Sequence, residues 1–193
     1  FRYPNAKCNA IEHLSFEVEE GDFVLICGSS GCGKSTLLRQ FKTEIAPQGE
    51  RTGKIFYDGQ PIEQLDLRRG ASEIGYVMQN PQNQIVTDKV WHELAFGLEN
   101  LGYNSKTIRL RVSEMATFFG IADWFEKDTN TLSGGQMQLL NLASVMAMQP
   151  RILLLDEPTS QLDPIAATEF IETLKKLNRD TGLTIILVEH RLE

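Results

Sequence analysis

A glycine-rich run, residues 28–35 (GSSGCGKS), has the residue types that phosphate binding requires. Its glycines leave backbone N–H groups accessible and permit dihedral angles that other residues avoid. Lys34 and Ser35 are the types that contact the β- and γ-phosphates of a nucleotide and its Mg²⁺ ion. A ligand-free glycine turn is the alternative, which an apolar strand before the run and a helix after it disfavour. The predicted phosphate site comprises Gly28, Ser29, Ser30, Gly31, Cys32, Gly33, Lys34, Ser35 and Thr36.

Two carboxylates, Asp156 and Glu157, directly follow the apolar residues 152–155. A buried strand would deliver both to the carboxyl edge of a parallel sheet, where open α/β sheets bind ligands. Glu157 would there polarise an attacking water. If this pair stood alone, a strand ending in solvated acids would be the better interpretation. The phosphate loop upstream favours a role in chemistry.

A third run, residues 132–136, reads LSGGQ. Ser133, Gly134 and Gly135 would begin a helix and form a second helix end that is receptive to an anion. One γ-phosphate does not need two such ends on one chain. An ordinary serine-capped helix is the alternative, which these residues alone would not exclude.

Alternating strand and helix patterns position these runs and predict an α/β fold with a parallel sheet. We expect strands at residues 23–27, 74–78, 152–155 and 184–188. We expect helices from about residue 34, from residue 90, over 106–119 with Ser105 as N-cap, from Ser133 to residue 148, and over 164–179. A hairpin signal at Asp58-Gly59 follows residues 54–57. These residues, the strand at 74–78 and residues 1–20 suggest an antiparallel layer beside the parallel core.

Composition limits the class of protein. The chain has 193 residues with a net charge of −7, which argues against a general nucleic-acid binder. No apolar stretch approaches the roughly 20 residues of a membrane span. The three cysteines lack metal-binding spacing, and a reduced compartment is the simplest interpretation. Cys32 is either a thiol activated by a helix N-terminus or a small residue at a variable position.

Together, GSSGCGKS and LSGGQ resemble the motifs of the ATP-binding cassette (ABC) ATPases, and the resemblance covers nearly the whole chain. It implies an α/β P-loop NTPase fold with a parallel core sheet, an antiparallel β layer and an inserted helical subdomain. It also implies that residues 1–193 are one ABC ATPase domain truncated at its C-terminus, with residues 81–148 as the helical signature subdomain. The implied activity is ATP hydrolysis with Mg²⁺.

The same resemblance implies roles for individual residues. Two domains would pack head to tail, and the signature residues of one would contact the ATP held by the other, with Asp163 in the dimer-contact loop. The implied nucleotide contacts beyond the phosphate loop are Tyr3 on adenine, His190 on the γ-phosphate, and Ser133, Gly134, Gly135 and Gln136 across the dimer. The implied metal ligands are Ser35, Gln79 and Asp156, and the implied catalytic residues are Glu157, His190, Lys34 and Gln79.

One position departs from the family pattern. The family usually follows LSGGQ with a basic or polar residue, a glutamine and an arginine, whereas this chain has Met137, Gln138 and Leu139. The missing arginine removes a cation from the start of the signature helix. Either a local ion pair is weakened or this half of the dimer hydrolyses ATP more slowly.

Two short runs resemble a particular branch of the family. Gln79-Asn80-Pro81 with Gln84, and the final residues VEHRLE, are similar to ATPases of energy-coupling-factor importers, which take up vitamins, their precursors, cobalt or nickel. The ending resembles the first half of chains that carry two ATPase domains. The implied partners are a second ATPase domain, on the same chain or on a paralogue, and integral membrane subunits, at the cytoplasmic face of the cell membrane.

Two other classes of protein also contain a phosphate loop of this kind. A soluble ABC ATPase that acts on ribosomes or nucleic acid is the main one; chromosome and repair members insert a long coiled coil between the two motifs. Here 99 positions separate Lys34 from Ser133, without a heptad run. A P-loop kinase outside the ABC family has no use for LSGGQ.

Overall fold

The protein is described by a computed structural model that covers residues 1–190. Its core is a sheet of parallel strands in the order β1 (Phe23–Cys27), β6 (Thr184–Glu189), β5 (Ile152–Asp156) and β4 (Ile74–Val77). A separate antiparallel pair joins β2 (Phe56–Tyr57) to β3 (Gln60–Pro61) across the predicted Asp58-Gly59 turn. The predicted fold class, a parallel core with an antiparallel layer, is confirmed. The strand at 74–78 was expected in the antiparallel layer, whereas β4 pairs in parallel with β5 and belongs to the core sheet.

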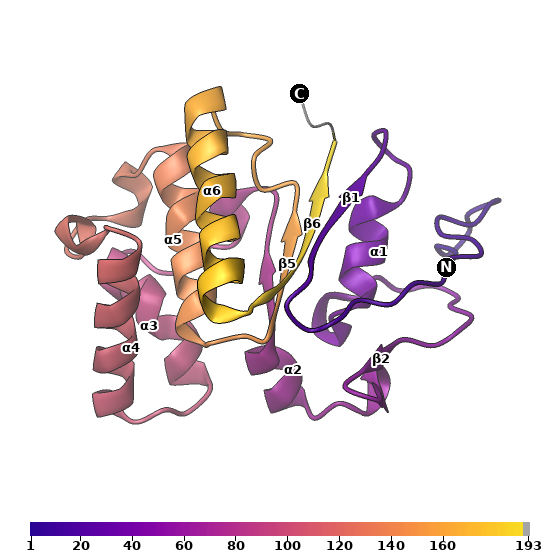
Figure 1. Ribbon diagram of the computed structural model, residues 1–193, viewed down its shortest axis with the longest axis horizontal. Coiled ribbons are helices and arrows are strands. Elements are labelled where there is room, and N and C mark those ends of the chain that lie inside the picture. The colour runs from indigo at the N-terminus through magenta and orange to yellow at the C-terminus, as the bar shows by residue number, and fades with distance from the viewer. Residues whose placement is uncertain (191–193) are drawn as a thin grey trace.

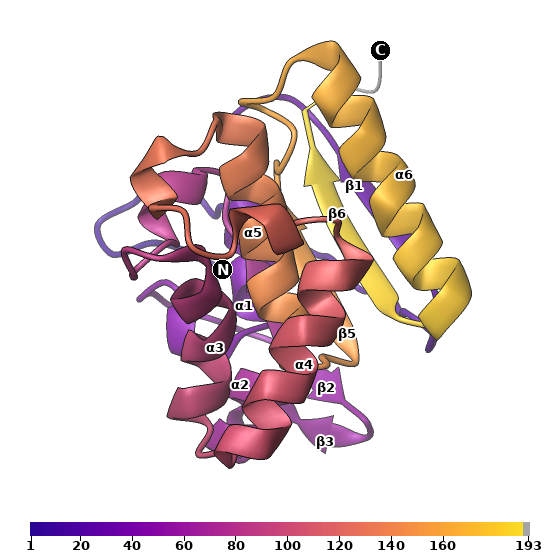
Figure 2. The ribbon, with the colours of Figure 1, turned by 90° about the vertical axis from the view of Figure 1, so that its left-hand side faces the viewer.

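Helices cover both faces of the sheet (Figure 1). They are α1 (Lys34–Gln40), α2 (Leu67–Glu73), α3 (Val90–Asn100), α4 (Ser105–Phe118), α5 (Gly134–Ala147) and α6 (Pro164–Thr181). The turned view in Figure 2 shows α3, α4 and α5 grouped together, with α6 alongside β6.

Side-chain alternation along β5 and β6 divides the interior into two clusters. Leu153 and Leu155 pack with α3, α4, α5 and α6, whereas Leu154 points to the other face, where it joins Leu38 of α1. These side chains are completely buried. Because both faces of these strands are covered, their sequences are continuously apolar, as expected for a parallel sheet.

The parallel arrangement gathers the strand ends. β5 and β6 run in the same direction in Figure 1, so the residues that follow them emerge at one edge of the sheet. The phosphate loop follows β1, Gln79 follows β4, Glu157 follows β5 and His190 follows β6. The topology therefore brings segments from across the whole chain to a common edge.

Of two predicted helix caps, the structure confirms one and shifts the other by one position. Ser133 caps α5 as predicted and forms a capping box with Gln136, in which each side chain accepts a hydrogen bond from the other residue's backbone N–H. The N-cap of α4, in contrast, is Asn104, whose side chain accepts from Thr107 N at 3.0 Å. Ser105 is the first helical residue, so its prediction as the cap was wrong by one position.

Residues 1–20 contribute little to the antiparallel layer. They supply one isolated antiparallel bridge, between Arg2 and Glu50, and no strand. Leu14 and Phe16, two large apolar residues of this segment, are exposed. The segment instead folds back on itself, with the amino group of Phe1 donating to Ile11 O at 2.9 Å.

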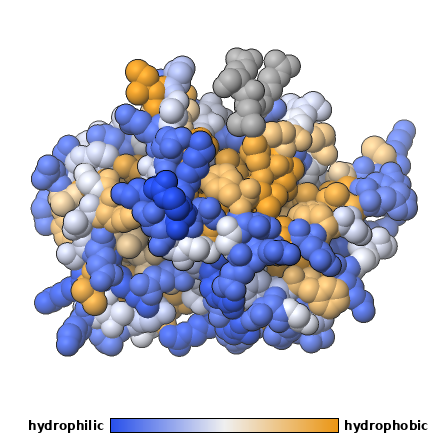
Figure 3. Space-filling view, in the orientation of Figure 1, coloured by the Kyte–Doolittle hydropathy of each residue, from blue (hydrophilic) through white to orange (hydrophobic). Residues whose placement is uncertain are grey.

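The surface is mostly polar, with one apolar area in the view of Figure 3. Hydrophobic residues gather there over β1 and β6, beside the hydrophilic surface of α6. Phe23 and Leu25 of β1 are only partly buried. Within residues 1–190, no helix has both the length and the apolar character that crossing a bilayer requires.

Candidate functional site

The phosphate loop requires glycine at two positions. Gly31 and Gly33 have φ values of +77° and +97°, which side chains other than glycine rarely tolerate. A Cβ atom on Gly33 would also lie 2.3 Å from the carbonyl oxygen of Ala10. The N-terminal segment therefore packs directly against this loop, and residue 33 can only be glycine.

Lys34 is folded into the loop that precedes it. Its Nζ donates to Gly28 O at 2.8 Å and to Ser29 O at 3.0 Å, and lies 3.6 Å from Oε1 of Glu157. The residue is only 6% exposed. A buried ammonium needs such partners, and the two carbonyls hold it at the centre of the loop.

Glu157 is the meeting point of three strand ends. Gln79 Nε2 donates to its Oε2 at 2.8 Å, and His190 Nε2 lies 2.9 Å from the same oxygen. Its φ is +48°, in the left-handed region, although its N–H still bonds to Val188 O at 2.9 Å. The structure thus gathers the four residues predicted as catalytic, Lys34, Gln79, Glu157 and His190, within hydrogen-bond or ion-pair distance of one carboxylate.

Asp156 is buried next to Glu157 and uses both oxygens. Ser35 Oγ donates to Oδ1 at 2.6 Å, and Tyr76 OH donates to Oδ2 at 2.9 Å. The guanidinium of Arg39 lies 3.5 Å from Oδ2 and also donates through Nε to Tyr76 OH at 3.5 Å. Burial raises the pKa of Tyr76, and its hydrogen bond to Arg39 raises the pKa of that guanidinium.

Tyr76 and Arg39 were not identified from the sequence. Their residue types are typical of a buried strand and of a helix surface, and their partners are distant in sequence. Glu189 was also missed: its carboxylate accepts from Thr159 Oγ1 at 2.7 Å, and burial raises its pKa. A carboxylate at the end of an apolar strand, directly before His190, was the available signal.

A pocket of about 410 Å³ opens between the phosphate loop and the N-terminal segment. Tyr3 lines it, and its hydroxyl is 2.9 Å from Thr36 Oγ1. The other residues that line the pocket are Ala6, Cys8, Asn9, Ala10, Gly31, Gly33, Lys34, Ser35, Thr36 and Glu157. The thiol of Cys32 is exposed.

The LSGGQ segment lies apart from this pocket. A Cβ on Gly134 would be 3.8 Å from Gln161 O, and one on Gly135 would be 3.7 Å from Ala166 Cβ, so α5 begins beside the loop that leads into α6. Asp163 caps α6 by accepting from Ile165 N and Ala166 N. Among residues 1–190, no hydrogen bond or salt bridge joins residues 133–136 or Asp163 to the phosphate loop, and Ser133 and Gly134 are exposed.

The donor set beside the phosphate loop suits a magnesium ion. Ser35, Asp156 and Gln79 offer a hydroxyl, a carboxylate and an amide, all with the oxygen donors that Mg²⁺ prefers. The described residues contain no cluster of three or more His, Cys, Asp or Glu side chains that could cage an ion alone. Mg²⁺ commonly uses one or two carboxylates together with substrate phosphates, which this arrangement fits.

Residues 11–160 match the ABC transporter family, and the chain belongs to it. The loop, the two strand-end carboxylates and the LSGGQ helix described above lie within this match. The chain is an ABC ATPase domain, a class of P-loop enzymes that hydrolyse ATP.

The sequences of several known proteins align with the whole length of this chain. An ABC transporter ATP-binding protein of Bacillus anthracis is 51% identical over 193 residues, which are 100% of this chain and 35% of that protein. The energy-coupling factor transporter ATP-binding protein EcfA1 of Clostridium perfringens is 40% identical over 201 residues, covering 100% of this chain and 69% of that protein. The chain therefore spans about a third of the length of the Bacillus relative.

Solved structures of ABC ATPases also superpose on this chain. CbiO1 from Clostridium perfringens, part of the ABC transporter complex CbiONQ, superposes with a TM-score of 0.84 at 33% identity, covering 94% of this chain and 72% of that one. The ATP-binding cassette MJ0796, a dimer bound to ADP and Pi, superposes with a TM-score of 0.80 at 29% identity, covering 94% of this chain and 80% of its own.

Proposed function

We propose that this chain is the ATP-hydrolysing domain of a membrane importer of the energy-coupling-factor type. The observation that carries the proposal is the convergence of Lys34, Gln79 and His190 on Glu157, directly beside the Ser35–Asp156 hydrogen bond. Such an arrangement provides a cation, hydrogen-bond donors and a carboxylate around one point at the end of a phosphate-binding loop, as phosphoryl transfer to water requires.

The phosphate loop binds the nucleotide in this proposal. Lys34 exchanges the carbonyl oxygens of Gly28 and Ser29 for β- and γ-phosphate oxygens, and loop N–H groups supply the remaining contacts. Tyr3 lines the adjoining pocket and stacks on the adenine ring. Ser35, Asp156 and Gln79 hold Mg²⁺, which when bound offsets charge on the transferring phosphoryl group.

Glu157 orients the attacking water. Its carboxylate is held on one side by Lys34 and on the other by Gln79 and His190, so its direction is set before a nucleotide arrives. When ATP is bound, His190 contacts the γ-phosphate in addition to Glu157, its present partner. Preorganised donors of this kind are usually the largest contribution to such a reaction.

The second half of each ATP site comes from a partner domain. This accords with the exposure of Ser133 and Gly134, which make no hydrogen bond or salt bridge to their own phosphate loop among the described residues. Ser133, Gly134, Gly135 and Gln136 close over the partner's ATP, with Asp163 in the adjoining dimer contact. ATP binding closes this dimer, and product release reopens it.

Membrane subunits convert this closure into transport. They dock near Gln79 and the helices of residues 81–148, at the cytoplasmic face of the membrane, and the cargo is a vitamin, a vitamin precursor or a cobalt or nickel ion. The resemblance to EcfA1 and to CbiO1 of the CbiONQ complex supports this branch. The second ATPase domain belongs to the same chain, in accord with Bacillus relatives about three times as long as this sequence.

The test is an affinity purification of the full-length native protein in mild detergent, followed by mass spectrometry. Integral membrane subunits in the eluate would support the importer, and their identity would narrow the cargo. Ribosomal proteins or nucleic acid without membrane subunits would overturn it in favour of a soluble ABC ATPase.

A further inference from the structure

We propose that Tyr76 and Arg39 are positioning residues that reserve one oxygen of Asp156, Oδ1, for the metal side of the ATP site. The inference rests on the proposed function in one respect, the assignment of Asp156 as a metal ligand. It goes beyond that function because neither residue belongs to the phosphate loop, to LSGGQ or to the strand-end residues predicted to act in catalysis.

The geometry divides the two carboxylate oxygens between two environments. Oδ1 accepts only from Ser35 among the side chains described, at 2.6 Å, and Ser35 is itself next to the phosphate-binding lysine. Oδ2 accepts from Tyr76 OH at 2.9 Å and lies 3.5 Å from the Arg39 guanidinium. One oxygen therefore faces the nucleotide side, while the other is held from β4 and α1.

The hydrogen bonds run in series from Arg39 through Tyr76 to Asp156. Arg39 Nε donates to the Tyr76 hydroxyl at 3.5 Å, and that hydroxyl donates its proton to Asp156. Asp156 is 1% exposed and Tyr76 is 8% exposed, so water cannot easily replace either contact. A carboxylate held at one oxygen cannot rotate to present both to a metal, which favours coordination through a single oxygen.

Partners of this kind orient a ligand without touching the metal, and their loss typically lowers metal affinity 10- to 100-fold. The structure also admits a plain alternative, in which Tyr76 only fills the core beside Leu154. Loss of packing would weaken nucleotide binding with and without metal alike. Loss of positioning would weaken only the metal-dependent part.

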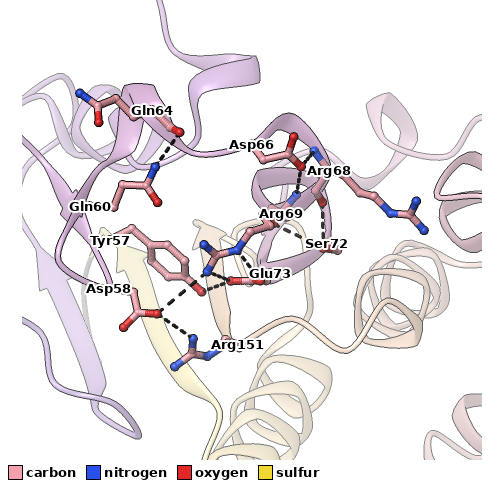
Figure 4. Close-up of polar contacts among 10 residues, drawn as sticks. All are labelled: Tyr57, Asp58, Gln60, Gln64, Asp66, Arg68, Arg69, Ser72, Glu73 and Arg151. Carbon is pink, nitrogen blue, oxygen red and sulfur yellow. Dashed lines mark hydrogen bonds and ion pairs between the residues drawn. The ribbon is translucent and has the colours of Figure 1, made fainter.

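The molecule contains a matched control at the opposite end of β4. Figure 4 shows Tyr57, whose hydroxyl donates to Glu73 Oε2 at 2.8 Å, while Arg69 Nε donates to Glu73 Oε1 at 2.9 Å. This is again a tyrosine, an arginine and a carboxylate, with Tyr57 also 8% exposed. The substitutions Tyr76→Phe and Tyr57→Phe therefore remove the same chemical group from similar surroundings.

The experiment measures the Kd of a fluorescent ATP analogue for the full-length protein, once in EDTA and once with saturating Mg²⁺. The Kd in EDTA divided by the Kd with Mg²⁺ reports how strongly the metal strengthens nucleotide binding. We expect Tyr76→Phe to lower this ratio about 10-fold or more with an unchanged Kd in EDTA, and Tyr57→Phe to leave both constants as in the wild type.

Arg39→Gln provides an independent variant, because the Arg39 side chain is 48% exposed and its loss should not impair folding. Arg39→Gln should also lower the ratio, and Arg39→Lys, which keeps the charge, should lower it less. Equal ratios for Tyr76→Phe, Arg39→Gln and Tyr57→Phe would overturn the inference, as would a parallel loss in both conditions. A wild-type protein without any metal-dependent nucleotide binding would instead overturn the proposed function.

Discussion

The Ser35 hydroxyl donates a 2.6 Å hydrogen bond to Oδ1 of Asp156, a residue 121 positions further along the chain. The two residues proposed as metal ligands are thus already in contact, at the junction of α1 and β5. Both side chains would hold the ion, and the fold brings them together without it. The site is preorganised for the metal in this sense.

Ser35→Ala tests this relationship. The variant removes one ligand and leaves a buried carboxylate with one hydrogen bond fewer, which should cost about 1–3 kcal/mol of stability. We expect a higher Mg²⁺ concentration for half-maximal ATP hydrolysis and a lower melting temperature. Ser35→Thr keeps the hydroxyl and serves as the control; if it behaved like the alanine variant, the hydroxyl would have no part in the effect.

Lys34→Ala should lose ATP affinity. The ammonium is buried and surrounded by loop carbonyls that a phosphate would replace, and hydrogen bonds to charged groups are worth about 1.5–3 kcal/mol, or roughly 10- to 150-fold in Kd. Calorimetric titration with ATP would measure the change. Lys175→Ala, at an exposed pair with Glu172, is the control. Normal nucleotide binding by the Lys34 variant would contradict the assignment of this loop.

Glu157→Gln should bind ATP but hydrolyse it about 10²- to 10⁴-fold more slowly, because the amide cannot accept a proton from the attacking water. The ATP-bound dimer should then persist and elute earlier from a size-exclusion column. Glu73→Gln, which alters a carboxylate at the far end of β4, should hydrolyse ATP at the parent rate. Undiminished turnover by the Glu157 variant would remove this residue from the catalytic role.

The contributions of the Tyr3 ring and of its hydroxyl to ATP affinity can be measured separately. Tyr3→Phe loses only the hydrogen bond to Thr36, whereas Tyr3→Ala also loses the aromatic face that would stack on adenine. Base–aromatic stacking contributes about 1–3 kcal/mol, so the alanine variant should bind ATP about 5- to 150-fold more weakly and the phenylalanine variant nearly normally. Equal affinities for both variants would mean that the ring does not contact the base.

Tyr57 should make the folded state sensitive to alkaline pH. Burial, together with the hydrogen bond to Glu73, raises the pKa of Tyr57 to about 12, from 10.0 in the unfolded chain. Its stabilising contribution is therefore complete below pH 10 and is lost as the pH rises to about 12. Denaturant melts of the wild type and Tyr57→Phe should differ in slope between these pH values. Parallel curves would show that this tyrosine titrates normally.

The features predicted from sequence are those with a local signal. Lys34 and Ser35 follow glycines, Asp156 and Glu157 follow an apolar strand, and Ser133 precedes a helical pattern, so each position was defined by its immediate neighbours. The parallel sheet followed from alternating strands and helices. Residues 1–20 were expected in the antiparallel layer, but strand formation depends on distant pairing, and this segment supplies one isolated bridge, between Arg2 and Glu50.

The features that were missed depend on distant contacts. Tyr76 meets Asp156 across 80 positions, and a tyrosine in an apolar strand is typical of any sheet. Arg39 is an unremarkable charge on a short helix until its neighbours are known. Asn104 and Ser105 are both good N-caps, and only the hydrogen bond to Thr107 N distinguishes between them.

The left-handed backbone conformation of Glu157 lowers the stability of the folded state. A φ of +48° is unfavourable by about 1–2 kcal/mol for a residue other than glycine, and Glu157→Gly would relieve it. Lys34 would keep two carbonyl partners in that variant. A screen of random variants for heat resistance alone would therefore tend to enrich proteins that fold better and no longer turn over ATP.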